Sequence, residues 1–216
     1  MSTRFYLPSS GSADVSPAFA SAWDFTAQAT RCNLPKKTVA SVTTLTDSAI
    51  STAISTNKAT LCRQFVSSPL AGQTISGTWT AIVRCAQDLP LTSTSKLALI
   101  LRACSIDGST IRGTLYSNLT LDSAIATLNL GGLAETRRVN AGALSSLTIQ
   151  PGDRLVLEVG VTVVLGLALL GNVIRFGCSA GADFPGNSGD TDDDNPWVDM
   201  PDVWEPPSYL PLLASG

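Results

Sequence analysis

The sequence predicts an all-β protein: a single jelly-roll-like β-sandwich with extended N- and C-terminal arms. Thr, Ser, Val, Ile and Leu dominate the 216 residues, and Gly, Pro, Asn and Asp interrupt them at short intervals. Several of the resulting segments alternate apolar and polar residues, as half-buried strands do. The pattern contains no amphipathic helices alternating with strands, as a βαβ fold requires. Many short strands separated by turns are typical of a sandwich or a barrel.

Seven segments have the length and composition of strands. In one of them, Ile75, Trp79 and Val83 fall on one face and Thr74 and Thr78 on the other. Residues 38–55 have a weak helical pattern, but they are too rich in Ser and Thr to predict a helix. The predicted strands are residues 61–66, 73–86, 97–105, 110–116, 144–149, 154–164 and 172–178.

Two motifs predict tight turns between these strands. Asp107-Gly108 is a hairpin signal, and Pro151-Gly152-Asp153 precedes the strand that begins at residue 154. The apolar stretch of residues 155–170 is shorter than the ~20 residues that span a membrane, and it contains Glu158. We therefore interpret it as two strands joined near Gly166 and expect no membrane association.

The composition excludes several classes of function. With no histidine, the chain has no Ser-His-Asp or Cys-His mechanism and no His-ligated metal. The net charge of −3 argues against nucleic-acid binding. Paired carboxylates from distant strands stay open as a catalytic alternative, although the chain has only three Glu and only Glu158 among them lies in a strand core. We expect a non-enzymatic protein without a cofactor. The five cysteines form no C-x-x-C pair, and we expect small buried thiols.

Charge and proline content divide the chain into three parts. Residues 1–22 form an expected N-terminal arm, residues 23–180 the sandwich, and residues 181–216 an acidic loop and C-terminal arm. Eight of the 17 acidic residues follow residue 176, and no Lys or Arg follows Arg175. The start of the chain lacks an apolar signal-peptide core, so we expect synthesis and folding in the cytoplasm.

The C-terminal part contains two candidate sites. Asp190, Asp192 and Asp194 alternate as oxygen ligands of Ca²⁺ can, although a solvated acidic loop explains the run equally simply. Beyond this run, five prolines favour extended backbone, yet the segment carries large apolar groups. We therefore predict an arm that binds a partner surface, with the same chain's sandwich as the alternative docking site. The predicted arm residues are Trp197, Trp204, Tyr209, Leu210, Leu212 and Leu213.

Residues 159–170 are apolar on both expected faces, so a hairpin formed by them needs cover from the rest of the domain or from another subunit. We predict a homo-oligomer, with a trimer favoured, because closed symmetry buries all copies equally. The predicted interface residues are Val161, Val163, Leu165, Leu167 and Leu169. Trp23, Trp79, Tyr116, Trp197 and Trp204 offer an alternative as a sugar-stacking platform, although Trp23 and Trp79 have the pattern of core residues.

Four segments resemble small, mostly uncharacterised β-rich structural proteins of tailed bacteriophages. They are TRFYLPSSGSADVSPAFASAWDF, RQFVSSPLAGQTISGTW, GDRLVLEVG and DNPWV, and the resemblance covers residues 3–200. It implies a virion protein and supplies no catalytic residues. Residues 163–170 depart from the family, whose members tend to have a polar loop there. This departure favours a special contact in the present chain.

Together these observations predict a capsid decoration (cement) protein located in the virion. Its partner would be the major capsid protein or another virion protein, without nucleic acid or membrane. The alternative is a tail-fibre or baseplate adhesin that binds host glycans. Copy number separates the two expectations, because a cement protein occurs in hundreds of copies per particle.

Overall fold

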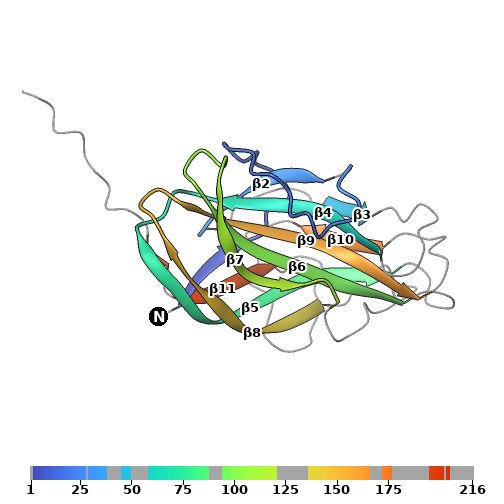
Figure 1. The fold of residues 1–216 in the computed structure, drawn as a ribbon. Helices are drawn as coiled ribbons and strands as arrows, with labels where there is room; N and C mark the ends of the chain where they lie inside the picture. Colours follow the sequence, from blue (N-terminus) through green and yellow to red (C-terminus); the bar gives the residue numbers. More distant parts are fainter. Residues whose placement is uncertain are drawn as a thin grey trace, which may run out of the picture.

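The computed structural model describes residues 2–27, 29–37, 45–49, 58–87, 94–120, 136–165, 172–176, 195–201 and 203–204. Every regular element in these ranges is a β-strand, and the strands form two sheets that pack as a sandwich (Figure 1). The predicted all-β sandwich is confirmed. None of the described residues belongs to a helix that could cross a membrane.

The two sheets take their strands from different parts of the chain. The first sheet joins strands from both ends of the sequence, whereas the second uses its middle part. In order, the first sheet contains β1 (Ser2–Tyr6), β11 (Trp197–Pro201), β5 (Gln73–Gln87), β10 (Asn172–Phe176) and β3 (Leu45–Ala49), and β8 (Thr136–Ile149) also pairs with β5. The second contains β2 (Thr30–Leu34), β4 (Lys58–Ser67), β9 (Arg154–Leu165), β6 (Thr94–Cys104) and β7 (Ile111–Asn118). The described pairs are antiparallel except β2 with β4.

The seven predicted strands correspond to β4 to β10, and both predicted turns are present. Gly108 (φ 75°) and Gly152 (φ 92°) adopt the left-handed conformation that these tight turns require. The Gly108 N–H donates to the Ser105 carbonyl at 2.9 Å, and the Asp153 N–H donates to the Gln150 carbonyl at 3.1 Å. Strand β3 lies inside residues 38–55, where the sequence showed only a weak helical pattern.

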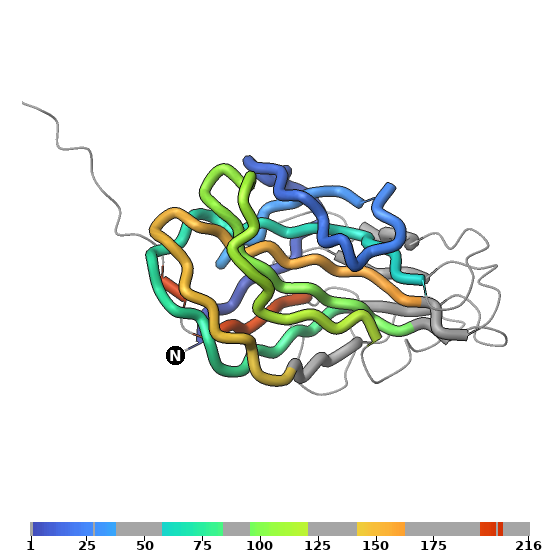
Figure 2. Tube along the Cα trace, in the orientation of Figure 1, coloured from blue at the N-terminus to red at the C-terminus, as the bar shows by residue number. Residues whose placement is uncertain are grey.

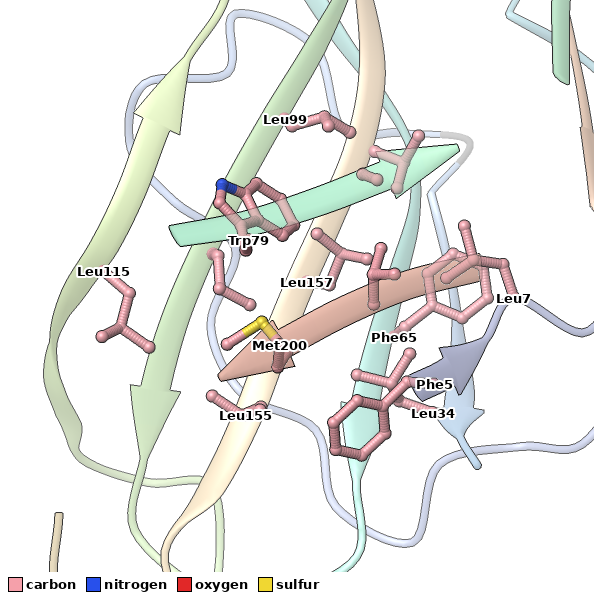
Figure 3. Close-up of a cluster of buried hydrophobic side chains, with 14 of the residues drawn as sticks. Phe5, Leu7, Leu34, Phe65, Trp79, Leu99, Leu115, Leu155, Leu157 and Met200 are labelled. Carbon is pink, nitrogen blue, oxygen red and sulfur yellow. The ribbon is translucent and has the colours of Figure 1, made fainter. Parts of the chain in front are cut away.

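The core lies between the sheets and combines side chains from both (Figure 3). Trp79 of β5 is 2% exposed and lies near Leu99 and Leu157 of the second sheet, as its position on the apolar face of β5 predicted. The Tyr116 ring meets the Trp79 ring edge-on, with 5.0 Å between the centroids. This contact adds directional aromatic packing to the apolar burial.

The predicted boundaries at residues 22 and 181 do not match the sandwich. Strands β1 and β11 pair antiparallel with each other, and β11 also pairs with β5. Residues 2–6 are therefore part of the first sheet and not of an arm. Trp197 is likewise a sandwich residue and only 6% exposed. Its indole packs against Ile82 and lies under the Arg4 guanidinium, 3.7 Å from the ring centroid.

The predicted hairpin over residues 159–170 is also wrong. Strand β9 pairs with β4 along one edge and with β6 along the other, so residues 159–163 have no free edge for a hairpin partner. Val161 is 2% exposed and lies in the core between the sheets, not at a subunit interface. Val163 and Leu165 belong to β9, but their side chains lie outside the described part of the structure.

Candidate functional site

A polar cluster lies on the outer face of the second sheet, beneath a segment that we call the strap (residues 8–25). The strap runs across this sheet in dark blue (Figure 2). Its backbone meets β4 at both ends. The Phe25 N–H donates to Ala59 and the Leu61 N–H to Phe25, while the Arg63 side chain donates to the Pro8 and Ser9 carbonyls at 3.4 Å. The strap buries side chains that would otherwise face water.

Glu158 of β9 lies at the centre of this covered face and is 0% exposed. The Trp23 indole N–H donates to Oε2 at 2.7 Å, and the Gln64 amide donates to Oε1 at 2.9 Å. The Arg102 guanidinium forms a buried ion pair at 2.5 Å, and the Ala20 N–H donates to both carboxylate oxygens at 3.1 and 3.3 Å. A buried carboxylate needs such partners because it has lost its hydration.

Strand register explains why these groups meet. Gln64 of β4 stands directly opposite Glu158, and Arg102 of β6 is opposite Val156, two residues along β9. Side chains two residues apart share one face of a strand. Arg102 also donates to the Ala18 carbonyl at 2.7 Å, so the same guanidinium binds both the sheet and the strap.

A second arginine extends the cluster towards the edge strand β2. The Arg31 Nε donates to the Gln64 side-chain oxygen at 3.0 Å, which orients the Gln64 amide towards Glu158. Its guanidinium also donates to the Pro17 carbonyl at 3.2 Å and stacks 3.9 Å from the Phe19 ring centroid. The strap is thus held by hydrogen bonds from Arg31 and Arg102 to its carbonyls, by hydrogen bonds from its Ala20 and Trp23 N–H groups to Glu158, and by stacking of Arg31 on its Phe19 ring.

Gly160 makes room for the Trp23 ring beside this cluster. A Cβ built on Gly160 would lie 2.6 Å from the Trp23 ring and would collide with the Thr60 carbonyl. Trp23 is 6% exposed and packs with Leu61 and Ile100, outside the core between the sheets. The prediction that Trp23 is a core residue is confirmed for this smaller outer core.

This arrangement suits a structural role for Glu158. Both of its oxygens are occupied by protein donors, and the strap separates it from solvent. Cys104 on the neighbouring strand is similarly unsuited to nucleophilic chemistry, because burial raises the pKa of its thiol to about 11. Across the described ranges, no group of three or more His, Cys, Asp or Glu side chains is placed to hold a metal ion.

A second polar group lies at one end of the sandwich, which we call the loop end (residues 68–72, 105–108, 150–153 and 203–204). Its segments gather at the left of Figure 2. Arg154 pairs bidentately with Asp14 of the strap at 2.8 and 2.9 Å, and Arg112 pairs with Asp153 at 3.0 Å. Asp107 is exposed, and hydrogen bonds led by the Ser105 hydroxyl lower its pKa to about 2.

The predicted arm begins at the loop end. The Ala71 N–H donates to the Trp204 carbonyl at 2.9 Å, and the Trp204 N–H donates to the Gln73 side chain at 3.1 Å. The Trp204 backbone is thus fixed, whereas the residue is 63% exposed. The remaining predicted site residues lie outside the described ranges and stay predictions: Leu167, Leu169, Asp190, Asp192, Asp194, Tyr209, Leu210, Leu212 and Leu213.

Sequence reasoning identified Glu158 as unusual but missed its partners. One usable signal was present: Gln64, Arg102 and Glu158 each interrupt an apolar strand segment with a polar side chain. Buried polar side chains are hydrogen-bonded, so three such interruptions in adjacent strands indicate a common cluster. The strap contacts had no comparable signal, because two of them use backbone groups of Ala18 and Ala20.

Comparisons with known proteins inform the fold. No family model and no curated protein matches this chain. A crystal structure of a CocE/NonD family hydrolase from Staphylococcus aureus is similar, with a TM-score of 0.51 and 8% sequence identity. The match covers 95% of this chain and 36% of the hydrolase chain, so the present chain spans about a third of that protein's length. At this identity the similarity supports the sandwich fold alone.

Proposed function

We propose that this chain is a non-enzymatic structural protein of a bacteriophage particle, and that it decorates the capsid as an oligomer. Its partner is the major capsid protein or another virion protein. The observation that carries the proposal is the fixed root of the C-terminal segment at Trp204. Twelve residues with Tyr209, Leu210, Leu212 and Leu213 follow this root, which gives the sandwich an attachment arm.

The state of Glu158 supports a non-enzymatic role. Among the three Glu it alone was predicted to lie in a strand core, which made it the leading candidate for acid-base chemistry. Its oxygens accept hydrogen bonds from the sheet and the strap, which leaves them no free position for a substrate. A sandwich stiffened in this way suits a protein that reinforces a shell.

The adhesin alternative keeps one supporting observation, the exposed Trp204 indole, which a sugar ring can stack against. The other three tryptophans, Trp23, Trp79 and Trp197, are 6%, 2% and 6% exposed. They cannot form part of a surface platform, so the cement proposal is the stronger of the two.

Quantitative mass spectrometry of purified particles tests the proposal. We expect hundreds of copies per particle, because cement acts at every repeat of the shell. A handful of copies would contradict it and favour the adhesin, which a glycan array would then examine. The arm is tested by a chain that ends after Trp204, which keeps β11 intact. This truncation should abolish binding to particles that lack the protein, whereas Phe25→Asp, at the opposite end of β4, should bind normally.

A further inference from the structure

Two of the three exposed large hydrophobic residues of the described structure lie at the loop end. Among the described residues, three large hydrophobic residues are exposed: Ile106 (56%), Trp204 (63%) and Phe25 (43%). Ile106 and Trp204 belong to the loop end, whereas Phe25 pairs with the first residues of β4, at the other end of that strand. An exposed apolar surface of this kind marks a contact site.

The contacts between the loops place Ile106 and Trp204 on one continuous surface. A Cβ built on Gly152 would lie 3.1 Å from the Ile106 Cδ1, which shows how closely the two turns approach. The Gly152 N–H donates to the Leu70 carbonyl at 2.8 Å, and the adjacent Ala71 binds Trp204. The exposed Pro151 lies between them against Gly72. Backbone hydrogen bonds thus hold this surface in a fixed shape.

The length and composition of the chain beyond Trp204 indicate what covers this surface. Residues 205–216 contain four large apolar side chains and only one charged side chain, Glu205. Pro206 and Pro207 favour extended backbone, at about 3.1 Å per residue. An extended spacer of this kind gives Tyr209 a reach of up to about 15 Å from Trp204. With this reach the apolar residues can meet the loop end of a neighbouring copy, and their own loop end is the alternative that the experiment below separates.

We propose that residues 205–216 of one copy bind the loop end of a second copy, against Ile106, Pro151 and Trp204. The occupant is thus the C-terminal segment of this same chain, donated by a neighbour. Because every copy carries one segment and one loop end, the exchange is reciprocal in a dimer or closes a ring. This inference rests on the arm of the proposed function: the arm links copies into the oligomer that decorates the capsid, and the loop end of a neighbouring copy is the surface that it binds.

A complementation experiment with two full-length variants tests the exchange. Ile106→Asp damages the loop end and leaves the segment intact, whereas Leu210→Asp with Leu213→Asp damages the segment and leaves the loop end intact. Sedimentation velocity measures the association of each. The unaltered chain should associate, and each variant alone should associate at least about tenfold more weakly. An equimolar mixture should regain association, because one intact segment can still meet one intact loop end.

Phe25→Asp is the matched control, since it places the same charge on an equally exposed apolar position at the far end of β4. It should associate like the unaltered chain. Ile106 is exposed and its carbonyl, which Arg154 binds, is kept in Ile106→Asp, so this variant should retain its near-ultraviolet circular dichroism. A monomeric unaltered chain, normal association of Ile106→Asp, or a mixture that stays monomeric would each overturn the inference.

The measurement uses the protein alone and is therefore independent of any phage particle. Normal exchange without particle binding would contradict the capsid proposal and leave the exchange standing. Particle binding by Ile106→Asp together with normal association would overturn the exchange and leave the capsid proposal standing. A segment that folds back on its own loop end would give a monomeric unaltered chain, which is one of the overturning results.

Discussion

The outer face of the first sheet at β5 and β8 differs in chemistry from the covered outer face of the second sheet. On the first sheet, β5 and β8 expose small uncharged groups such as Thr74, Thr78 and Thr148, and the Thr74 and Thr148 hydroxyls share a hydrogen bond at 2.9 Å. On the second sheet, Glu158 and Arg102 lie in the equivalent outer position but are buried under the strap. Exposed hydroxyl groups can form hydrogen bonds with water, whereas covered charges need protein partners at defined positions. The covered face therefore determines where the strap lies.

Among the changes that test this comparison, removing the charge of Glu158 should lower the stability of the protein most. Glu158→Gln leaves Arg102 buried without its counter-charge, and we expect a loss of about 3–5 kcal/mol in the free energy of unfolding. Urea unfolding followed by tryptophan fluorescence measures it. Thr74→Val on the exposed face is the control and should change stability by less than about 0.5 kcal/mol. Equal losses for the two variants would mean that the buried cluster has no special weight.

The local consequence of Glu158→Gln is equally specific. Hydrogen exchange should accelerate in the strap, where the Ala20 N–H loses one of its two acceptor oxygens, before it accelerates in β5 and β8. Uniform acceleration over the whole chain would show that the strap does not open separately from the sandwich.

Two glycines sharpen the same comparison. Gly160→Ala introduces a methyl group against the Trp23 ring and the Thr60 carbonyl, so we expect a loss of about 3 kcal/mol from overpacking. Gly142 on β8 has nothing within 4 Å of the corresponding position. Gly142→Ala should therefore range from no change to a gain of about 1 kcal/mol through reduced freedom of the unfolded chain. Thermal unfolding of both variants tests the pair, and a destabilised Gly142→Ala would refute the contrast.

An exposed carboxylate should show the smallest effect. Hydrogen bonds from Ser105 and then Ser109 lower the pKa of Asp107 from 3.8 to about 2. The pKa is lower in the folded state than in the unfolded state, so the ionised carboxylate stabilises the fold. This contribution is fully present above pH 3.8 and is lost as the pH falls through about 2. Ser105→Ala should raise the pKa of Asp107 towards 3.8, as measured by a carboxyl NMR titration. An unchanged pKa would show that the Ser105 hydroxyl is not the main cause.

The middle of the chain was more predictable from sequence than its ends. Strands β4 to β9 can be predicted from the local alternation of apolar and polar residues and from turn residues such as Gly108 and Gly152. Strands β1 and β11 lack that signal, because each is defined by pairing with a segment about 190 residues away. The prolines near Trp197 predicted extended backbone without a regular strand, which is wrong for residues 197–201, because these residues form β11.

The covered face explains the remaining errors. Alternation predicts which side chains share a face, and Leu157 and Val161, four residues apart on β9, do lie in the same core. It carries no information on which segment covers that face, so Val161 was assigned to a subunit interface when it packs between the sheets. For Glu158, burial was predictable, but the donors Trp23 and Ala20 lie more than 130 positions away in sequence.

The pairing of β1 with β11 has a consequence for biosynthesis. Strand β1 is synthesised before its described partner β11, which follows about 190 residues later. At about 5–20 residues per second, translation separates the two by about 10–40 s. During this interval the nascent chain presents Ser2–Tyr6 as an unsatisfied edge, open to pairing with other chains. The pairing of β1 with β11 is therefore completed only after β11 has been synthesised, and high local ribosome density on the message would raise the risk of aggregation.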